Sequence, residues 1–175
     1  MTCEKGNLAS LSVAFRNLAT LNGSKVEEIV IRNSHVSNLY GNLFFKSNAR
    51  ILKIFNVPIK SIADHVFYGV NETLEELRII NSSLTEFPRD AFKSLSNLKI
   101  LELNHHFIHT LNNNEFDDSQ LPAKLEKMYI TNGNISEIGA NTFQHVKKLK
   151  VIDLHGNQIV VLKKNQFRGL RDAEL

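Results

Sequence analysis

Residues Leu74 to Phe92 read LEELRIINSSLTEFPRDAF, and this stretch decides the fold. Leu77 and Ile79 are apolar residues separated by one polar residue, the spacing of a short strand whose side chains alternate between two faces. Leu84 and Phe87 follow after wider gaps, which predicts a turn that brings the chain back into the core. Ile79 and its apolar partners are therefore expected to point inward and Arg78 outward.

The same frame recurs six times along the chain. Six of the eleven Phe residues share one register, at intervals of 23, 25, 24, 27 and 24 residues. Positions 1, 4, 6, 11 and 14 of each unit are apolar, and a Phe follows them. A unit with one strand cannot bury its apolar face alone, so the units are expected to stack, with parallel strands about 4.8 Å apart and the Phe side chains forming a spine behind them. The six sets are Val26, Ile29, Ile31, Val36, Leu39, Phe44; Ala49, Leu52, Ile54, Ile59, Ile62, Phe67; Leu74, Leu77, Ile79, Leu84, Phe87, Phe92; Leu98, Leu101, Leu103, Ile108, Leu111, Phe116; Leu125, Met128, Ile130, Ile135, Ile138, Phe143; and Leu149, Ile152, Leu154, Ile159, Leu162, Phe167.

The period and the pattern L-x-x-L-x-L-x-x-N-x-L are those of leucine-rich repeats. They predict an α/β solenoid, a curved array with one parallel β-sheet on its concave face. About six units fill residues 26–175, starting near residues 26, 49, 74, 98, 125 and 149, and residues 1–25 are predicted to form a partial N-terminal cap. Within that cap Leu11, Phe15, Leu18 and Leu21 have helix-like spacing. The unit that starts near 98 carries an insertion at Asp117 to Pro122, expected to bulge from the convex side.

Composition narrows the classes of function. The net charge of +3 comes from interspersed acidic and basic residues without a like-charge block, which argues against a nucleic-acid partner. No apolar run is long enough to span a bilayer, and residues 1–6 lack the pattern of a signal peptide. The lone Cys3 is either a free thiol near a frayed terminus or the remnant of a Cys-bearing cap. Neither interpretation of Cys3 predicts catalysis, and no cluster of residues in the sequence predicts a catalytic site, a metal site or a cofactor.

The repeats resemble the arthropod leucine-rich-repeat proteins that are similar to the oplophorus-luciferin 2-monooxygenase non-catalytic subunit. The phrases that carry the resemblance are VEEIVIRNSHV from Val26, LEELRIINSSLTEFP from Leu74, and Asn157-Gln-Ile. The resemblance implies a secreted, non-enzymatic binding or stabilising partner with a Cys-bearing N-terminal cap. Because the other cap cysteines, a signal peptide and a C-terminal flank are missing, we expect a fragment, whose uncapped end at Arg171 to Leu175 invites self-association.

Strand residues that alternate with the buried ones are expected to line the concave face. Several are apolar, and aromatic or Arg residues beside apolar neighbours are typical binding anchors. Phe55 and Ile80 occupy equivalent positions in adjacent units and are expected about 5 Å apart, with Lys53 and Arg78 beside them. The alternative is that a loop or flank covers this patch. The predicted partner-binding residues are Arg32, Lys53, Phe55, Arg78, Ile80, Glu102, Asn104, Tyr129, Asp153 and His155.

Three other patterns have mainly structural interpretations. Position 9 is usually an Asn whose side chain bonds backbone groups after the strand, but here it is Asn only at Asn157. In four other units the preceding residue is expected to take over this bonding: Asn33, Asn56, Asn81 and Asn132. The histidines at 105, 106 and 109 are interpreted as turn residues, because a closed zinc site needs about four ligands. Glycosylation sequons at Asn22, Asn71 and Asn134 favour secretion, and a fourth, at Asn81, is expected to be the least accessible.

These patterns predict a non-catalytic leucine-rich-repeat binding module that contacts a protein through its concave sheet, most simply outside the cell. Two alternatives stay open. One is an accessory subunit that stabilises a luciferase-like monooxygenase, as the resemblance implies, and the other is an intracellular regulatory protein. The apolar repeat pattern does not identify the partner, because a repeat fold determines the shape of the surface, whereas the exposed residues determine which ligand binds.

Overall fold

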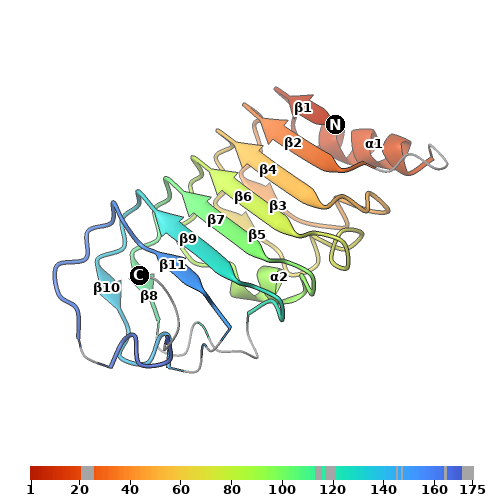
Figure 1. Ribbon diagram of the computed structural model, residues 1–175. Helices are drawn as coiled ribbons and strands as arrows, with labels where there is room; N and C mark the ends of the chain where they lie inside the picture. The colour runs from red at the N-terminus through yellow and green to blue at the C-terminus, as the bar shows by residue number, and fades with distance from the viewer. Residues whose placement is uncertain are drawn as a thin grey trace.

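A computed structural model describes residues 1–20, 26–112, 116, 121–144, 146, 148–163 and 165–170. Its main element is a seven-stranded parallel sheet with the strand order β1-β2-β4-β6-β7-β9-β11, in which one strand per unit lies beside the next (Figure 1). The solenoid predicted from the repeat is therefore confirmed. The strands are β1 (Thr2–Glu4), β2 (Glu28–Arg32), β4 (Ile51–Phe55), β6 (Glu76–Ile80), β7 (Ile100–Asn104), β9 (Lys127–Thr131) and β11 (Val151–Asp153).

The register of the sheet follows the sequence frame residue by residue. Ile54 pairs with Ile79 and Phe55 pairs with Ile80 across β4 and β6. Ile54 and Ile79 are each 1% exposed, whereas Phe55 and Ile80 are half-buried on the other face. This alternation, required by the pleat of a strand, confirms the predicted facing of both pairs.

The Phe register forms the predicted spine behind the sheet. Phe44, Phe67, Phe92, Phe116 and Phe143 are all fully buried. The rings of Phe116 and Phe143 stack with centroids 5.1 Å apart, and those of Phe44 and Phe67 lie 5.8 Å apart. Between units three and four the contact runs through Phe87, whose ring meets Phe92 and Phe116 edge to face. Stacked and edge-to-face pairs add to the burial of these large side chains.

The N-terminal segment combines a strand that the sequence did not predict with a helix that it did. Helix α1 (Leu8–Thr20) buries Leu11 and Phe15, and the Phe15 ring continues the spine 5.1 Å from Phe44. Strand β1 pairs with β2, so that Cys3 lies opposite Ile31. The expectation of a frayed terminus at Cys3 was therefore wrong. This strand is held by backbone pairing with β2. Its three residues are too few to show the alternation of apolar residues by which a strand is predicted from sequence.

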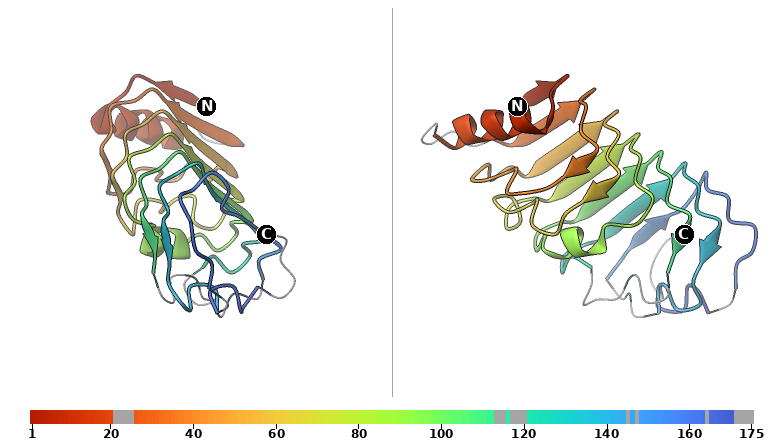
Figure 2. Two further views of the ribbon diagram at one scale, coloured as in Figure 1. Left: turned by 90° about the vertical axis from the view of Figure 1, so that its left-hand side faces the viewer. Right: turned by 180° about the vertical axis from the view of Figure 1, so that it is seen from behind.

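A second, shorter set of strands lies on the far side of the core. Strands β3 (Asn38–Leu39) and β5 (Ser61–Ile62) form one parallel pair, and β8 (Thr110–Leu111) and β10 (Glu137–Ile138) form another. The third unit has no strand there, because helix α2 (Arg89–Lys93) begins directly after Pro88. Figure 2, right, shows the two short pairs and α2 in front of the main sheet. Pro88 has no N–H to donate to a ladder, which accounts for the interruption.

The sixth unit keeps the frame but buries less of it. Ile152 is 1% exposed, while Leu154 and Ile159 are half-buried and Leu162 is 65% exposed. Together with Phe167 these side chains line an apolar hollow of about 310 Å³ in this unit. The same positions are buried in the preceding unit because the sixth unit covers them. Of the predicted insertion at Asp117 to Pro122, residues 117–120 lie outside the described part.

Candidate functional site: the concave face of the sheet

The side chains that face away from the core form three columns across the strands, one for each outward position. The central column contains the basic residues Lys53 and Arg78, which pair in register. Both are neutralised by carboxylates of the same face. Lys53 Nζ lies 3.1 Å from Glu28 Oε1, and Arg78 donates to Glu76 and Glu102, each at 2.6 Å. The hydrogen bond to Glu76 raises the pKa of Arg78 further.

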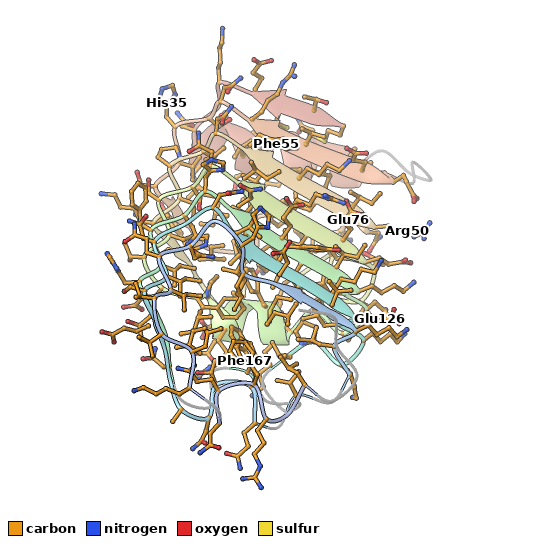
Figure 3. The ribbon with its side chains drawn as sticks, turned by 60° about the vertical axis from the view of Figure 1, so that its left-hand side comes forward. His35, Arg50, Phe55, Glu76, Glu126 and Phe167 are labelled. Atoms are coloured by element: carbon orange, nitrogen blue, oxygen red, sulfur yellow. The ribbon has the colours of Figure 1, made fainter. Side chains whose placement is uncertain are left out.

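Phe55 and Ile80 lie side by side at the carboxyl ends of β4 and β6, as predicted. Figure 3 shows the Phe55 side chain standing away from the sheet. Arg32 precedes Phe55 in this column and Asn104 follows Ile80. Arg32 is paired with Glu4 at 3.1 Å, and hydrogen bonds from Asn33 and then the charge of Arg32 lower the pKa of Glu4. The apolar pair is thus bordered by polar groups, and the cation nearest to it in this column is already paired.

The remaining predicted residues continue the same surface toward the last strand. Tyr129 lies between Glu102 and Asp153 in register and is half-buried. His155 Nδ1 lies 2.8 Å from Asp153 Oδ1, and the His155 N–H donates to the same oxygen. Burial raises the pKa of Asp153, but the hydrogen bonds from His155 outweigh it, so that the pKa is lowered. Nine of the ten predicted residues therefore lie at outward positions of the strands, and His155, in the turn after β11, contacts one of them, Asp153.

The turn after each strand contains the substitute asparagines. Asn33, Asn56, Asn81 and Asn132 all have positive φ, between 50° and 59°, a conformation that Asn tolerates. Asn81 Nδ2 donates to Asn56 Oδ1 at 2.9 Å, and Asn56 Nδ2 donates to Asn33 Oδ1 at 3.2 Å. These side chains bond one another along the surface. Asn157, the one Asn at position 9, bonds the backbone as expected, through the Ile130 and Leu154 carbonyls.

His106 takes position 9 in the fourth unit and is 3% exposed. Its Nδ1 accepts the Ile108 N–H at 3.2 Å, and its Nε2 is buried without a hydrogen-bond partner. Burial, followed by the nearby His105, lowers the pKa of His106 to about 4. His105 and His109 are not buried with it. Within the described residues no group of three or more His, Cys, Asp or Glu lies close enough to hold a metal ion.

The sequons differ from their expected ranking. Asn81, expected to be the least accessible, is exposed, whereas Asn71 and Asn134 are half-buried. That ranking was wrong because the turn ladder runs along the surface rather than into the core. Asn71 is also engaged locally, since its Oδ1 accepts the Gly69 N–H at 3.2 Å. Asn22 lies outside the described residues.

Sequence reasoning missed a charge ladder along one edge of the sheet. Position 2 of successive units is Glu27, Arg50, Glu75, Lys99, Glu126 and Lys150, so that the sign alternates. Ion pairs connect neighbours along it: Arg50 with Glu27 at 2.8 Å and with Glu75 at 3.0 Å, Lys99 with Glu75 at 2.8 Å, and Lys150 with Glu126 at 3.0 Å. Figure 3 shows Arg50 and Glu126 along this edge. The alternation is visible once the units are aligned at position 2.

Comparisons with known proteins agree with this architecture. The leucine-rich-repeat family matches residues 72–121 and 123–173, more than half of the chain, and the chain belongs to this family. It is 27% identical over 172 residues to Toll-like receptor 3 of Boselaphus tragocamelus. The matched residues are 94% of this chain and 18% of that protein. It is 30% identical over 103 residues to leucine-rich repeat-containing G-protein coupled receptor 5 of Rattus norvegicus, covering 56% of this chain and 10% of the receptor.

Two further similarities come from other contexts. P-granule-associated novel protein 1 of Caenorhabditis elegans is 28% identical over 100 residues, which are 57% of this chain and 16% of that protein. A solved structure, a crystal structure of a TLR13-ssRNA13 complex, superposes with a TM-score of 0.76 at 22% identity, covering 98% of this chain and 27% of that one. This chain thus spans between about a tenth and a fifth of the length of these curated relatives.

Proposed function

We propose that this chain is a non-catalytic binding module that contacts a protein through the concave face of its sheet, centred on Phe55 and Ile80. Leucine-rich-repeat proteins generally mediate protein–protein interactions. The observation that supports this site is the half-buried apolar pair in register, bordered by Arg32 and Asn104 in its own column and by Lys53 and Arg78 in the next. Apolar side chains surrounded by polar groups are the usual arrangement of an interface centre and its rim.

The ion pairs around that centre indicate which kind of partner fits. Arg32, Lys53 and Arg78 are each matched by a carboxylate of the same chain. A row of phosphates would have to break these pairs, which favours a protein over a single-stranded RNA of the kind held in the similar TLR13 complex. Binding is therefore expected to depend weakly on ionic strength and strongly on an apolar side chain that the partner inserts beside Phe55.

We place the module outside the cell. Two of the relatives reported above are named as receptors, and the sequons at Asn71, Asn81 and Asn134 lie on half-buried or exposed positions. No helix in the described part of the chain has the length and apolar character to cross a membrane. Detection of N-linked glycan on the protein isolated from its source tissue tests this placement, and the absence of glycan there contradicts it.

A second candidate function follows from the resemblance to the luciferase-associated subunit. The phrase LEELRIINSSLTEFP from Leu74 supports it, and it predicts an accessory chain that stabilises a monooxygenase. The relatives reported above are of other kinds, so we place this function second to the receptor-like module, and an intracellular regulator third. Co-purification of a catalytic chain whose activity falls when this chain is removed distinguishes the accessory role.

The test of the concave site is quantitative affinity capture from extracts of the source tissue. The bait is the intact chain, compared with Phe55→Ser and Ile80→Ser variants and with a Tyr68→Ser control, since Tyr68 is exposed elsewhere. A concave-face partner is recovered by the parent chain and by Tyr68→Ser and is lost from the Phe55 and Ile80 variants. Equal recovery with all four baits rejects the site. Circular dichroism confirms that each bait is folded.

The apolar surface of the sixth unit is a second candidate contact. Val160, Val161 and Leu162 are 90%, 62% and 65% exposed beside the apolar hollow, and an exposed apolar patch of this kind favours association. We propose that two copies associate through it at high concentration. Sedimentation of the parent chain and of Leu162→Asp tests this, because only the parent should form dimers.

A further inference from the structure

The flank of the solenoid opposite the main sheet has a gap in its hydrogen-bond ladder. In this ladder a residue just after position 14 donates its N–H to the position-14 carbonyl of the preceding unit. Ala63 donates to Leu39 O at 2.9 Å, and Gly139 donates to Leu111 O at 2.8 Å. The equivalent residue in the third unit is Pro88, which has no N–H. The carbonyl of Ile62 therefore loses the donor that its counterparts have.

Backbone groups on both sides of the gap are left for another partner. Among the described residues no hydrogen bond reaches the Ile62 carbonyl on the β5 side or the Thr110 carbonyl on the β8 side. The Phe87 carbonyl, which accepts the Arg89 N–H at 2.8 Å as α2 begins, is itself an acceptor and cannot pair with either carbonyl. An unpaired strand edge is a template for another strand.

A hollow of about 550 Å³ lies over this gap, and we call it the flank notch. Ile62, Thr110 and Phe87 line it, and so do the carboxylates of Asp64, Glu86 and Asp90. Arg89 contacts Asp90 at 3.5 Å. Asp64 and Glu86 are exposed and have no ion-pair partner in the described part of the chain. The notch thus combines unpaired backbone acceptors with uncompensated negative charge.

We propose that the flank notch binds an extended protein segment that carries Lys or Arg and adds as a short strand beside β5. A backbone N–H of the segment supplies the donor that Pro88 cannot. A basic side chain of the segment then reaches Asp64 and Glu86. Strand addition of this kind takes its affinity from main-chain hydrogen bonds and its specificity from alternate side chains. This site is separate from the concave face, so one chain can hold two partners at once.

The test uses a defined probe, the peptide acetyl-(Thr-Lys)₃-amide, titrated into the intact ¹⁵N-labelled chain. We expect backbone amide shifts at Ile62, Ala63, Thr110 and Leu111, with none at Phe55 or Ile80. The same peptide with N-methylated backbone amides and the acidic peptide acetyl-(Thr-Glu)₃-amide should bind at least about tenfold more weakly, because each lacks one of the two complementary features.

Variants of the chain separate the two contributions. The double variant Asp64→Asn, Glu86→Gln should weaken the lysine peptide about fivefold or more, while Glu137→Gln, an exposed carboxylate on the same flank, should not. Pro88→Ala provides an N–H for Ile62 and should also weaken binding. Absence of shifts around the notch with the lysine peptide overturns the proposal. Equal binding of the N-methylated peptide overturns strand addition, and shows instead a site for any flexible polycation.

Discussion

The imidazole of His106 lies against the backbone of Gly133 in the next unit. A Cβ at position 133 would lie 2.2 Å from Cε1 and 2.4 Å from Nε2 of that ring. Both residues occupy position 9, where an Asn side chain would normally bond the turn. The large residue in one unit is accommodated by the absence of a side chain in the next.

Gly133→Ala is expected to destabilise the chain by about 1 to 3 kcal/mol, the usual cost of overpacking a filled core. The added methyl group would overlap the ring of His106, which is 3% exposed, so that the ring or the turn has to shift. Urea denaturation measures the loss. In a His106→Ala background the same substitution should cost much less, because the obstructing ring is gone. Equal costs in the two backgrounds would show that the ring is not the obstacle.

His106 should make stability dependent on pH in the mildly acidic range. The unfolded chain protonates this residue near its ordinary pKa of 6.5, while the folded chain does so only at about 4. The unfolded state therefore binds the extra proton between these values, and stability falls as pH is lowered, by up to about 1.4 kcal/mol per pH unit. Above 6.5 the effect is absent.

The measurement is urea denaturation between pH 7 and pH 4 for the parent chain and for His106→Asn. Carboxylates with lowered pKa, such as that of Glu4, also weaken the folded state in acid, but they act equally in both proteins. The stability difference between the two should shift in favour of His106→Asn as the pH falls. Parallel curves would contradict a neutral buried imidazole.

Phe143→Ala should cost about 3 to 5 kcal/mol, as the removal of a buried aromatic side chain does in packed cores. Its ring is fully buried between Phe116 at 5.1 Å and Phe167 at 5.4 Å. Phe167→Ala is the matched control and should cost distinctly less, since Phe167 is half-buried with no described unit beyond it. Thermal or urea melts decide it, and a cost below about 1 kcal/mol for Phe143→Ala would exclude a core spine.

Glu75→Lys should lower the melting temperature by placing three cations in succession on the charge ladder. Hydrogen bonds from Arg50 and then Lys99 lower the pKa of Glu75 to about 2, so this carboxylate is charged at neutral pH. The loss should shrink in about 1 M salt, where the Debye length is about 3 Å. Glu72→Lys, exposed nearby without an ion pair among the described residues, is the control. A salt-independent loss would point to packing instead.

Hydrogen exchange should show protection that falls from β6 and β7 toward β11. Each inner strand is paired on both sides, whereas among the described residues β11 is paired with β9 alone, and the sixth unit leaves Leu162 exposed. Local opening costs least where few apolar contacts hold a segment. The experiment is run on a demonstrated monomer at low concentration. Uniform protection from β6 through Val151–Asp153 would show that the last unit closes its own core.

The apolar frame by itself determined the solenoid, the burial of Ile54 and Ile79, the Phe spine and the outward facing of Phe55 and Ile80. These follow from sequence because the side-chain period of a strand is local, and because a unit with one apolar face is stable only when stacked. The expected bonding of turn backbone groups by Asn56 and Asn81 was not determined in this way, because their side chains bond one another and the side chain of Asn33 between units. What was local is the positive φ at these positions, which Asn tolerates.

Only the tertiary structure decided which charges are free. Lys53 and Arg78 were predicted as binding anchors from their positions, yet Glu28 and Glu102, from neighbouring units about 25 residues away in the chain, pair with them, in addition to Glu76 in the same strand as Arg78. The pairing of Cys3 with Ile31 and the gap at Pro88 also depend on contacts between units. A repeat pattern specifies the positions within a unit, whereas the charge and the hydrogen-bonding groups left for a partner are set where two units meet.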